Sequence, residues 1–328
     1  MSEKIDRRTF VKGSLLASAT AAALGTASGK AGAAEAKNVP PADKPAAKDL
    51  IPKGKIGDLE ISRLLLGGNL LTHYTHSRDL KYVYKLAALY NTDEKILETL
   101  ATAEENGVDT LVIHTVPRAL SVLKKHRQRG GKMKWIICTT ANIDDKLEAY
   151  TKSVRQLVDD GTDAIYLWGV RADQLAAKGR MDLIARTVEI AKDLGVPSGV
   201  GAHDLNVIKK CEESKIDNDF YIKTLHHHQY PSAPRSDELR GAYAENPGYW
   251  CNDPKAVVDF MKGVKKPWIA FKVMAAGAIP PANAFKYAIQ SGADFVLAGM
   301  FDFEIKDDAQ TLKGLLAKNL PRERPWLA

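Results

Sequence analysis

The feature that most constrains the fold of this chain is a regular alternation of short apolar runs with amphipathic stretches, which begins near Lys53. Such an alternation is typical of a parallel β-sheet whose strands are joined by crossover helices. Glycine follows several of the amphipathic stretches, as in Asn106-Gly107 and Leu194-Gly195, and glycine readily adopts the left-handed conformation that ends a helix. The eight expected strands are Leu64–Gly67, Thr110–His114, Trp135–Thr139, Ala164–Trp168, Ser198–Ala202, Tyr221–Leu225, Trp268–Val273 and Phe295–Ala298.

Helices are expected between these strands. Eight strand–helix pairs on about 270 residues favour a closed (β/α)8 barrel, the TIM barrel architecture, over an open sheet. An open doubly wound sheet is the alternative, although the chain has no Gly-x-Gly-x-x-Gly motif that opens a helix. The expected helices are Glu94–Asn106, Arg118–Arg129, Leu147–Asp159, Met181–Leu194, Leu205–Glu213, Pro254–Gly263, Pro281–Gln290 and Asp307–Lys318.

Composition excludes several classes of protein. The chain has 328 residues, of which 45% are hydrophobic and 27% charged, as in ordinary globular proteins and unlike disordered, collagen-like or coiled-coil chains. It has no run of about 18 apolar residues, so no integral membrane segment is expected after processing. The net charge of +7 is spread without a basic stripe, which gives no indication of nucleic-acid binding.

The first fifty residues differ in composition from the rest. Arg7 and Arg8 precede a weakly apolar, alanine-rich stretch and resemble a twin-arginine (Tat) export signal, which a translocon receptor binds. Cleavage after Ala33 would separate a signal peptide (1–33) from a flexible linker (34–52) and the barrel (53–328). The expected partner during export is the Tat translocon, and the expected location is periplasmic or otherwise extracytoplasmic. A disordered alanine-rich tail is the alternative.

Several segments resemble the aldo-keto reductases. Lys55–Gly68 resembles the amino-terminal hairpin and first strand of that family, and Gly107–His114 resembles its second-strand segment. Later segments match in order and spacing, so the resemblance covers roughly residues 53–320 and implies an aldo-keto reductase-like (β/α)8 barrel with an N-terminal hairpin. These later segments are Trp135–Thr140, Asp163–Trp168, Val196–His203 and Phe295–Phe303.

The catalytic residues of that family are not matched. Aldo-keto reductases use an Asp–Tyr–Lys–His tetrad, and the corresponding positions here hold Val112, Pro117, Thr140 and Trp168, none of which can act as the tetrad does. The loop Gly299–Asp302 also lacks the basic residue that the family often places on the 2′-phosphate of NADP. The resemblance therefore implies an NADP cofactor that these residues do not support, and carbonyl reduction by the family's mechanism is not expected.

Histidines follow three of the expected strands. In such barrels the reacting groups come from the carboxyl ends of the strands, where this chain has His114, His203 and the run His226–His228. Three converging imidazoles would suit Zn²⁺, Mn²⁺ or Fe²⁺, so His114, His203, His226 and His228 are candidate metal ligands, with Asp204 as a supporting or catalytic group. Because strand side chains alternate, His226 and His228 are expected to point the same way. Structural histidines, or histidines that orient a substrate, are the alternatives.

Lys272 is the other candidate catalytic residue. A lysine within the apolar run Trp268–Val273 is costly if it stays charged and unpaired, so it is expected to act as a nucleophile, a proton carrier or an anion clamp. The alternative is that it faces the helices and extends its amine to solvent. The candidate substrate-binding residues are Asn69 and Trp168 at strand ends, together with Tyr230 and Arg235 in a long segment, Gln229–Asn252, that is expected to cover the barrel mouth.

Three functions remain open from the sequence. The favoured one is an exported, non-reductase enzyme (an isomerase, lyase or hydrolase) acting on a polar, oxygen-rich small molecule, such as a sugar-like compound, by His and Lys acid–base chemistry, with or without a divalent metal. The second is an NAD(P)-dependent oxidoreductase with a rearranged site. The third is a non-catalytic binder of a carbohydrate or another small ligand that kept only the barrel.

Overall fold

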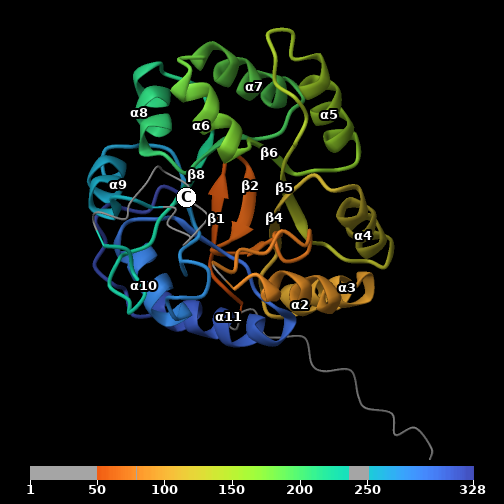
Figure 1. Cartoon of the computed structure of the whole chain (residues 1–328), viewed down its shortest axis with the longest axis vertical. Helices are drawn as coiled ribbons and strands as arrows, with labels where there is room; N and C mark the ends of the chain where they lie inside the picture. The colour runs from red at the N-terminus through yellow and green to blue at the C-terminus, as the bar shows by residue number, and fades with distance from the viewer. Residues whose placement is uncertain (1–49, 79, 236–250) are drawn as a thin grey trace, which may run out of the picture. The chain divides into compact units, whose positions relative to one another are not determined.

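Eight parallel strands close into a barrel in the computed structural model, and the helices form a ring around it (Figure 1). The structure describes residues 50–78, 80–235 and 251–328. The expected signal peptide, most of the linker and residues 236–250 of the expected mouth segment lie outside this part of the chain. The barrel order is β10-β3-β4-β5-β6-β7-β8-β9. These strands are β3 (Leu64–Gly67), β4 (Thr110–His114), β5 (Lys134–Cys138), β6 (Ala164–Leu167), β7 (Ser198–Ala202), β8 (Phe220–Thr224), β9 (Trp268–Phe271) and β10 (Phe295–Ala298).

All eight expected strands are present, so the closed barrel is confirmed over the open sheet. Two helices were not expected, α2 (Tyr82–Tyr90) and α6 (Gly169–Ala177), and the last helix begins at Asp302 rather than at Asp307. None of the helices in the described ranges is both long and apolar enough to cross a bilayer. The other helices are α3 (Asp93–Glu105), α4 (Pro117–Gln128), α5 (Glu148–Asp159), α7 (Met181–Asp193), α8 (Leu205–Glu213), α9 (Pro254–Met261), α10 (Pro281–Gln290) and α11 (Asp302–Leu316).

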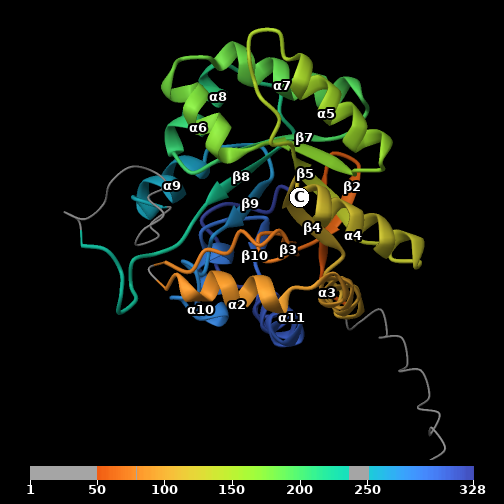
Figure 2. The same cartoon turned by 45° about the vertical axis from the view of Figure 1, so that its right-hand side comes forward.

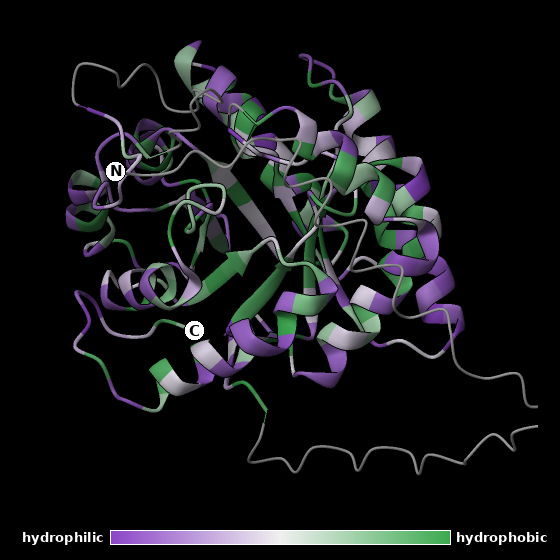
Figure 3. Cartoon of the chain, turned by 60° about the horizontal axis from the view of Figure 1, so that its bottom comes forward, coloured by the Kyte–Doolittle hydropathy of each residue, from purple (hydrophilic) through white to green (hydrophobic). Residues whose placement is uncertain are grey.

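The hydrophobic core has two layers, because successive strand residues face opposite sides of the barrel wall. Leu65, Val112 and Ile136 belong to the inner cluster that fills the barrel. Their strand neighbours Leu64 and Leu111 belong to the larger cluster between the strands and the helices. Figure 3 shows the result: the strands are largely apolar, whereas the helices are hydrophilic on much of their surface.

The amino-terminal end of the barrel is closed by the two ends of the described chain. An antiparallel hairpin, β1 (Lys53–Ile56) and β2 (Leu59–Ser62), precedes the first barrel strand. The Arg63 side chain that follows it donates hydrogen bonds to the backbone oxygens of Asp294 at 2.9 Å and Ala328 at 2.7 Å. In TIM barrels this end serves stability, and the chemistry lies at the opposite end.

Helix α2 lies beside the start of α11, in the insertion between β3 and α3 (Figure 2). The Tyr90 hydroxyl, at the end of α2, donates a hydrogen bond to the Asp302 carboxylate at 2.7 Å. Lys95 of α3 contacts the same carboxylate at 3.1 Å. These contacts fix the insertion against the carboxyl end of β10, at the side of the barrel where a site is expected.

Candidate active site

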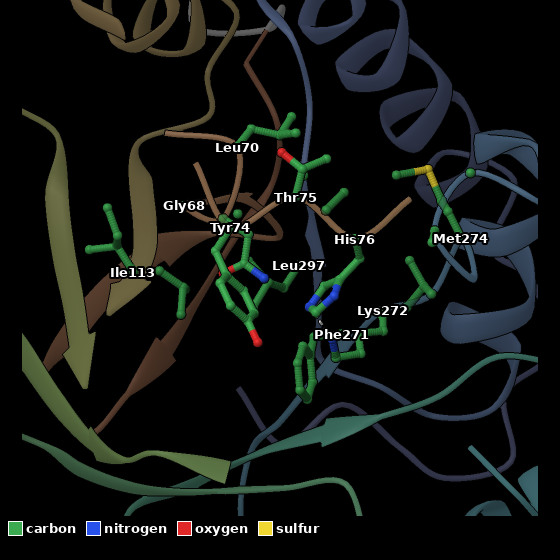
Figure 4. A pocket seen from close by; sticks show the side chains of 18 of the residues that line it. Gly68, Leu70, Tyr74, Thr75, His76, Ile113, Phe271, Lys272, Met274 and Leu297 are labelled. Carbon is green, nitrogen blue, oxygen red and sulfur yellow. Dashed lines mark hydrogen bonds between the residues drawn. The ribbon is translucent and has the colours of Figure 1, made fainter. Parts of the chain in front are cut away.

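A cavity of about 880 Å³ opens at the carboxyl ends of the barrel strands. This is the size of pocket that holds a small organic ligand. Its wall includes the residues that follow β3, β6 and β9, namely Gly68, Trp168 and Lys272, and part of the α2 insertion. Figure 4 shows Tyr74 and His76 from the insertion and Lys272 from the end of β9 around this space. The polar side chains on the wall include Asn69, Tyr74, His76, His114, Thr140, Tyr166, Trp168, His203 and Lys272.

Lys272 and His76 form a pair across the cavity. The Lys272 Nζ atom lies 2.8 Å from the His76 Nε2 atom, and in Figure 4 the two side chains point toward one another. Burial and, next, the positive charge of Lys272 lower the pKa of His76 to about 2, with smaller effects from His203 and His114. His76 is therefore neutral near pH 7, so its Nε2 accepts the hydrogen bond that the Lys272 ammonium donates.

The backbone that carries Lys272 is held in a strained conformation. Lys272 has a φ of 57°, and Ala275 and Ala276 follow with φ angles of 47° and 55°. Residues with a side chain seldom adopt the left-handed region, which costs roughly 1 kcal/mol each. Strain of this kind persists only where the surrounding structure enforces it, and it is concentrated at functional sites. The strain directs Lys272 out of the strand direction and into the cavity, which excludes the expected alternative that it faces the helices.

His203 is oriented by a buried carboxylate from α6. The His203 Nδ1 atom lies 2.8 Å from the Asp173 Oδ2 atom, and both side chains are more than nine-tenths buried. The other carboxylate oxygen accepts the backbone N–H groups of His203 at 3.1 Å and Asp204 at 3.0 Å. An imidazole that donates from Nδ1 to a carboxylate carries its basic lone pair on Nε2. Burial lowers the pKa of His203, against the opposing effect of Asp173, so the ring is neutral near pH 7.

His114 lies on another wall of the same cavity, between two aromatic rings. Its ring is stacked on Trp168 with centroids 6.4 Å apart and meets the edge of Tyr74 at 6.0 Å. Burial lowers the pKa of His114, so it is also neutral near pH 7. The three cavity histidines are thus neutral, and the positive charges on the described cavity wall come from Lys272 and Arg78.

The four candidate metal ligands do not form one set. His114 and His203 line the cavity, whereas His226 and His228 do not. Strand β8 ends at Thr224, before the histidine run, and His228 Nε2 then bonds the backbone oxygen of Cys251 at 2.7 Å. The two rings do lie close together, with centroids 5.6 Å apart, but outside the cavity wall. Across the described ranges, no group of three or more His, Cys, Asp or Glu side chains is arranged to hold a metal ion.

The remaining sequence candidates are divided in the same way. Asn69 and Trp168 line the cavity, as expected of residues at strand ends. Asp204 instead begins α8, where its side chain accepts the Asn206 N–H at 2.9 Å. Tyr230 lies near the rings of His226 and His227 and, like Arg235, does not belong to the cavity wall. The structure therefore gathers Asn69, Trp168, His114, His203 and Lys272 in one place.

Sequence reasoning missed two residues that complete this site. His76 lies in the loop before α2, and its position over β9 depends on how that insertion folds back. Asp173 lies in α6, a helix that follows Trp168 without a side-chain cap. The sequence of α6 contains several good helix formers, which could have predicted the helix. An Asp on the inner face of that helix would be buried and would need a partner such as a histidine.

The end of the cavity that α11 lines is acidic. Glu304 and Asp308 both line it, and Asp308 is only 6% exposed. Burial, followed by the negative charges of Glu304 and Asp307, raises the pKa of Asp308 to about 7. Near pH 7 Asp308 is therefore only partly ionised.

The raised pKa of Asp308 predicts a pH-dependent loss of stability. Between its ordinary pKa of 3.8 and about 7, the folded protein keeps a proton that the unfolded chain has released. The free energy of unfolding therefore falls as the pH rises through this window and levels off above it. We expect Asp308→Asn to raise the free energy of unfolding by about 2 kcal/mol more at pH 8 than at pH 5. Urea denaturation at the two pH values measures this, with Asp193→Asn, at an exposed position at the end of α7, as control; equal effects of Asp308→Asn at both pH values would contradict it.

Comparison with known proteins places the fold but not the activity. No protein-family model matches the sequence, and no curated protein matches it either. Among solved structures, a protein from Pseudomonas aeruginosa assigned as an aldo-keto reductase has a TM-score of 0.52 at 16% identity, over 81% of this chain and 94% of that chain. An aldo-keto reductase from Bacillus halodurans, in its holo form, has a TM-score of 0.53 at 12% identity, over 82% and 96%. A mutant of Gox0644 in complex with NADPH has a TM-score of 0.51 at 12% identity, over 81% and 93%.

These likenesses establish an aldo-keto reductase-like (β/α)8 barrel. They also raise the question of whether the cavity fits a 2′-phosphorylated nicotinamide dinucleotide. The N-terminus of α11 is closed by its own side chain, because Glu304 accepts the Phe301 N–H at 2.9 Å. Asp302 adds a second negative charge in the first helical turn. Lys95 offsets part of the charge of Asp302, but the Glu304 carboxylate already binds the helix start, so this end of the cavity does not fit a 2′-phosphate.

Proposed function

We propose that this barrel is an enzyme that moves a proton next to a carbonyl or carboxylate group of a small, polar, oxygen-rich substrate. Isomerisation or elimination is the corresponding reaction class. The observation that carries the proposal is the placement of an oriented imidazole, His203, and a cation, Lys272, on the wall of one cavity. A base and an electrophile on one substrate are what proton abstraction beside a carbonyl requires.

His203 is the proposed general base. Its Nδ1 atom is engaged by Asp173, so Nε2 is the nitrogen that receives the substrate's C–H proton. The resulting imidazolium is stabilised by the Asp173 carboxylate, which keeps its own charge. Returning the proton to a neighbouring carbon completes an isomerisation, and expulsion of a leaving group from that carbon completes an elimination.

Lys272 is the proposed electrophile. One of its ammonium hydrogens is donated to the neutral His76, which holds the side chain in place. The same ammonium can donate to the substrate oxygen on which negative charge develops as the proton leaves. Apolar neighbours such as Phe271 and Val273 lower the local polarity and strengthen this interaction. A metal ion is not needed for these steps.

Proton exchange with solvent tests the proposal even when the product has not been identified. The purified protein is incubated in D₂O with a panel of hydroxy-carbonyl compounds and hydroxycarboxylates, and the loss of C–H signals is followed by proton NMR. We expect exchange in at least one compound, and a fall of about 10²–10⁴-fold in its rate for Asp173→Asn, which removes the group that orients His203. Exchange at an unchanged rate in this variant, or no exchange across the panel, contradicts the proposal.

The pH dependence of the reaction follows from the lowered pKa of His203. The base is active when neutral, so the acid limb of kcat/KM is expected to have an apparent pKa below the ordinary value of 6.5. A pH–rate profile measures this. In Asp173→Asn the opposing, pKa-raising effect of the carboxylate is lost, so the acid limb should move to still lower pH. An acid limb above pH 6.5 would exclude His203 as the base.

An oxidoreductase is the second candidate, because the likeness to aldo-keto reductases includes a structure solved with NADPH. The absence of the family tetrad and the acidic start of α11 weigh against this candidate. Fluorescence titration with NADH and NADPH decides between the two. Binding of either, followed by reduction of a carbonyl compound, would favour the oxidoreductase.

A further inference from the structure

The α11 end of the cavity contains a buried carboxyl group for which the described part of the chain provides no partner. Asp308 is 6% exposed and lines the cavity. No residue in the described ranges forms a hydrogen bond or an ion pair with this carboxyl group. The carboxylate oxygens are not among the fully buried side-chain atoms that lack a partner in the described ranges, so they border the cavity, where a donor on a ligand can reach them.

The neighbouring groups at this end are hydrogen-bond acceptors rather than donors. Glu304 lies one helical turn before Asp308, on the same face of α11, and lines the cavity with it. Helix α10, which also borders the cavity, begins with Pro280 and Pro281, and neither residue has a backbone N–H. A ligand group that fits this end must therefore bring the donors itself.

The basic side chains of the cavity wall form their hydrogen bonds with residues other than Glu304 and Asp308. Lys272 bonds His76 at the barrel mouth, and Arg78 donates to the Ser232 hydroxyl and backbone oxygen at 2.5 and 2.9 Å. The charged groups that act on Asp308 are Glu304 and Asp307, both negative. One cavity wall thus carries both the Lys272 cation and these carboxyl groups.

We infer that the α11 end of the cavity is a subsite for an ammonium or guanidinium group of the ligand, with Glu304 and Asp308 as its acceptors. A cation at this position would supply the hydrogen bonds that Asp308 lacks and would offset the repulsion between the two carboxyl groups. The proposed function adds an anionic ligand group at Lys272, and this part of the inference depends on that proposal. A ligand with both groups is bipolar, such as an amino acid or an amine-bearing carboxylate. A phosphate at the α11 end is excluded by the same charges.

Calorimetric titration of the full chain with simple bipolar probes tests the subsite. The probes are straight-chain ω-amino carboxylates of about four to ten carbons, with the unsubstituted carboxylates and the n-alkylamines of equal length as references. We expect at least one ω-amino carboxylate to bind about tenfold more tightly than the carboxylate of the same length. The double variant Glu304→Gln/Asp308→Asn should lose this advantage and still bind the plain carboxylate. The exposed neighbour variant Asp307→Asn should keep it.

Two results would overturn the inference: no probe with an amino group binds more tightly than its reference, or the advantage persists in the double variant. The variant Lys272→Met separates this outcome from a failure of the proposed function. If that variant and the wild type bind plain carboxylates equally, the anion end is wrong. Binding of n-alkylamines that is lost in Glu304→Gln/Asp308→Asn would then still support the cation subsite, and amines that fail to bind the wild type would reject it.

Discussion

Lys272→Met is expected to lower kcat/KM by about 10²–10³-fold, because it removes the group that stabilises negative charge on the substrate oxygen. Methionine keeps the length of the side chain and removes its charge. The free energy of unfolding should stay the same or rise, since a half-buried ammonium on a strained backbone is replaced by an apolar side chain. Enzyme kinetics and urea denaturation measure the two effects. Lys286→Met, on the exposed face of α10, is the matched control.

An NMR titration of His76 provides a readout that is independent of the substrate's identity. Burial and the charge of Lys272 together lower the pKa of His76. In Lys272→Met the second cause is removed, so the pKa of His76 should rise toward its ordinary value of 6.5. A pKa of His76 that does not move would show that the two side chains are not paired in solution. A normal kcat/KM in the variant would exclude Lys272 as the electrophile.

The strands were predictable from the sequence because both of their faces are buried. Leu64–Gly67, Thr110–His114, Ser198–Ala202 and Phe295–Ala298 are found with the expected bounds. A parallel strand enclosed by barrel and helices is apolar along its whole length, and its ends are marked by polar residues or glycine. The bounds of β8 and β9 were less well predicted. Lys223 interrupts the apolar run of β8, and Lys272 directly follows that of β9.

Lysines show where sequence reasoning reaches its limit. The sequence singled out Lys272 as a lysine inside a strand, but β9 ends at Phe271, and Lys272 turns into the cavity just beyond it. Of the lysines within the barrel strands, the buried one is Lys223, which is 1% exposed and donates to the Thr224 hydroxyl at 2.8 Å. The sequence does not show which polar partner Lys223 or Lys272 has, because the folded structure determines which groups lie near each side chain.

The candidate site was partly predictable for a related reason. Residues at the carboxyl ends of barrel strands share one rim, so His114, His203 and Lys272 could be grouped without coordinates. His76 and Asp173 come from a loop insertion and a helix, and no periodicity in the sequence fixes where those segments meet the rim. The histidine run follows β8, which ends at Thr224, and side-chain alternation does not fix which way residues beyond the end of a strand face. The rings of His226 and His228 lie 5.6 Å apart but outside the cavity wall.

The opposite end of the barrel allows a stability test that leaves the cavity untouched. Asp294 is 1% exposed and bonds the Arg324 guanidinium at 2.5 Å, the Trp268 N–H at 2.9 Å and the Leu327 N–H at 2.8 Å. It thereby ties the starts of β9 and β10 to the C-terminal segment. Removing one partner of a buried ion pair leaves the other charge without compensation.

Asp294→Ala is therefore expected to lower the free energy of unfolding by about 3–5 kcal/mol, measured by urea denaturation. The double variant Asp294→Ala/Arg324→Met should lose less than the single variant, because it removes the uncompensated charge together with its partner. Asp259→Ala, which breaks an exposed pair with Lys255, should lose far less stability than Asp294→Ala. A double variant less stable than Asp294→Ala would show that packing around Arg324, rather than charge pairing, holds this end of the barrel together. Because Asp294 lies at the amino-terminal ends of the strands, ligand binding at the cavity should persist in every variant that still folds.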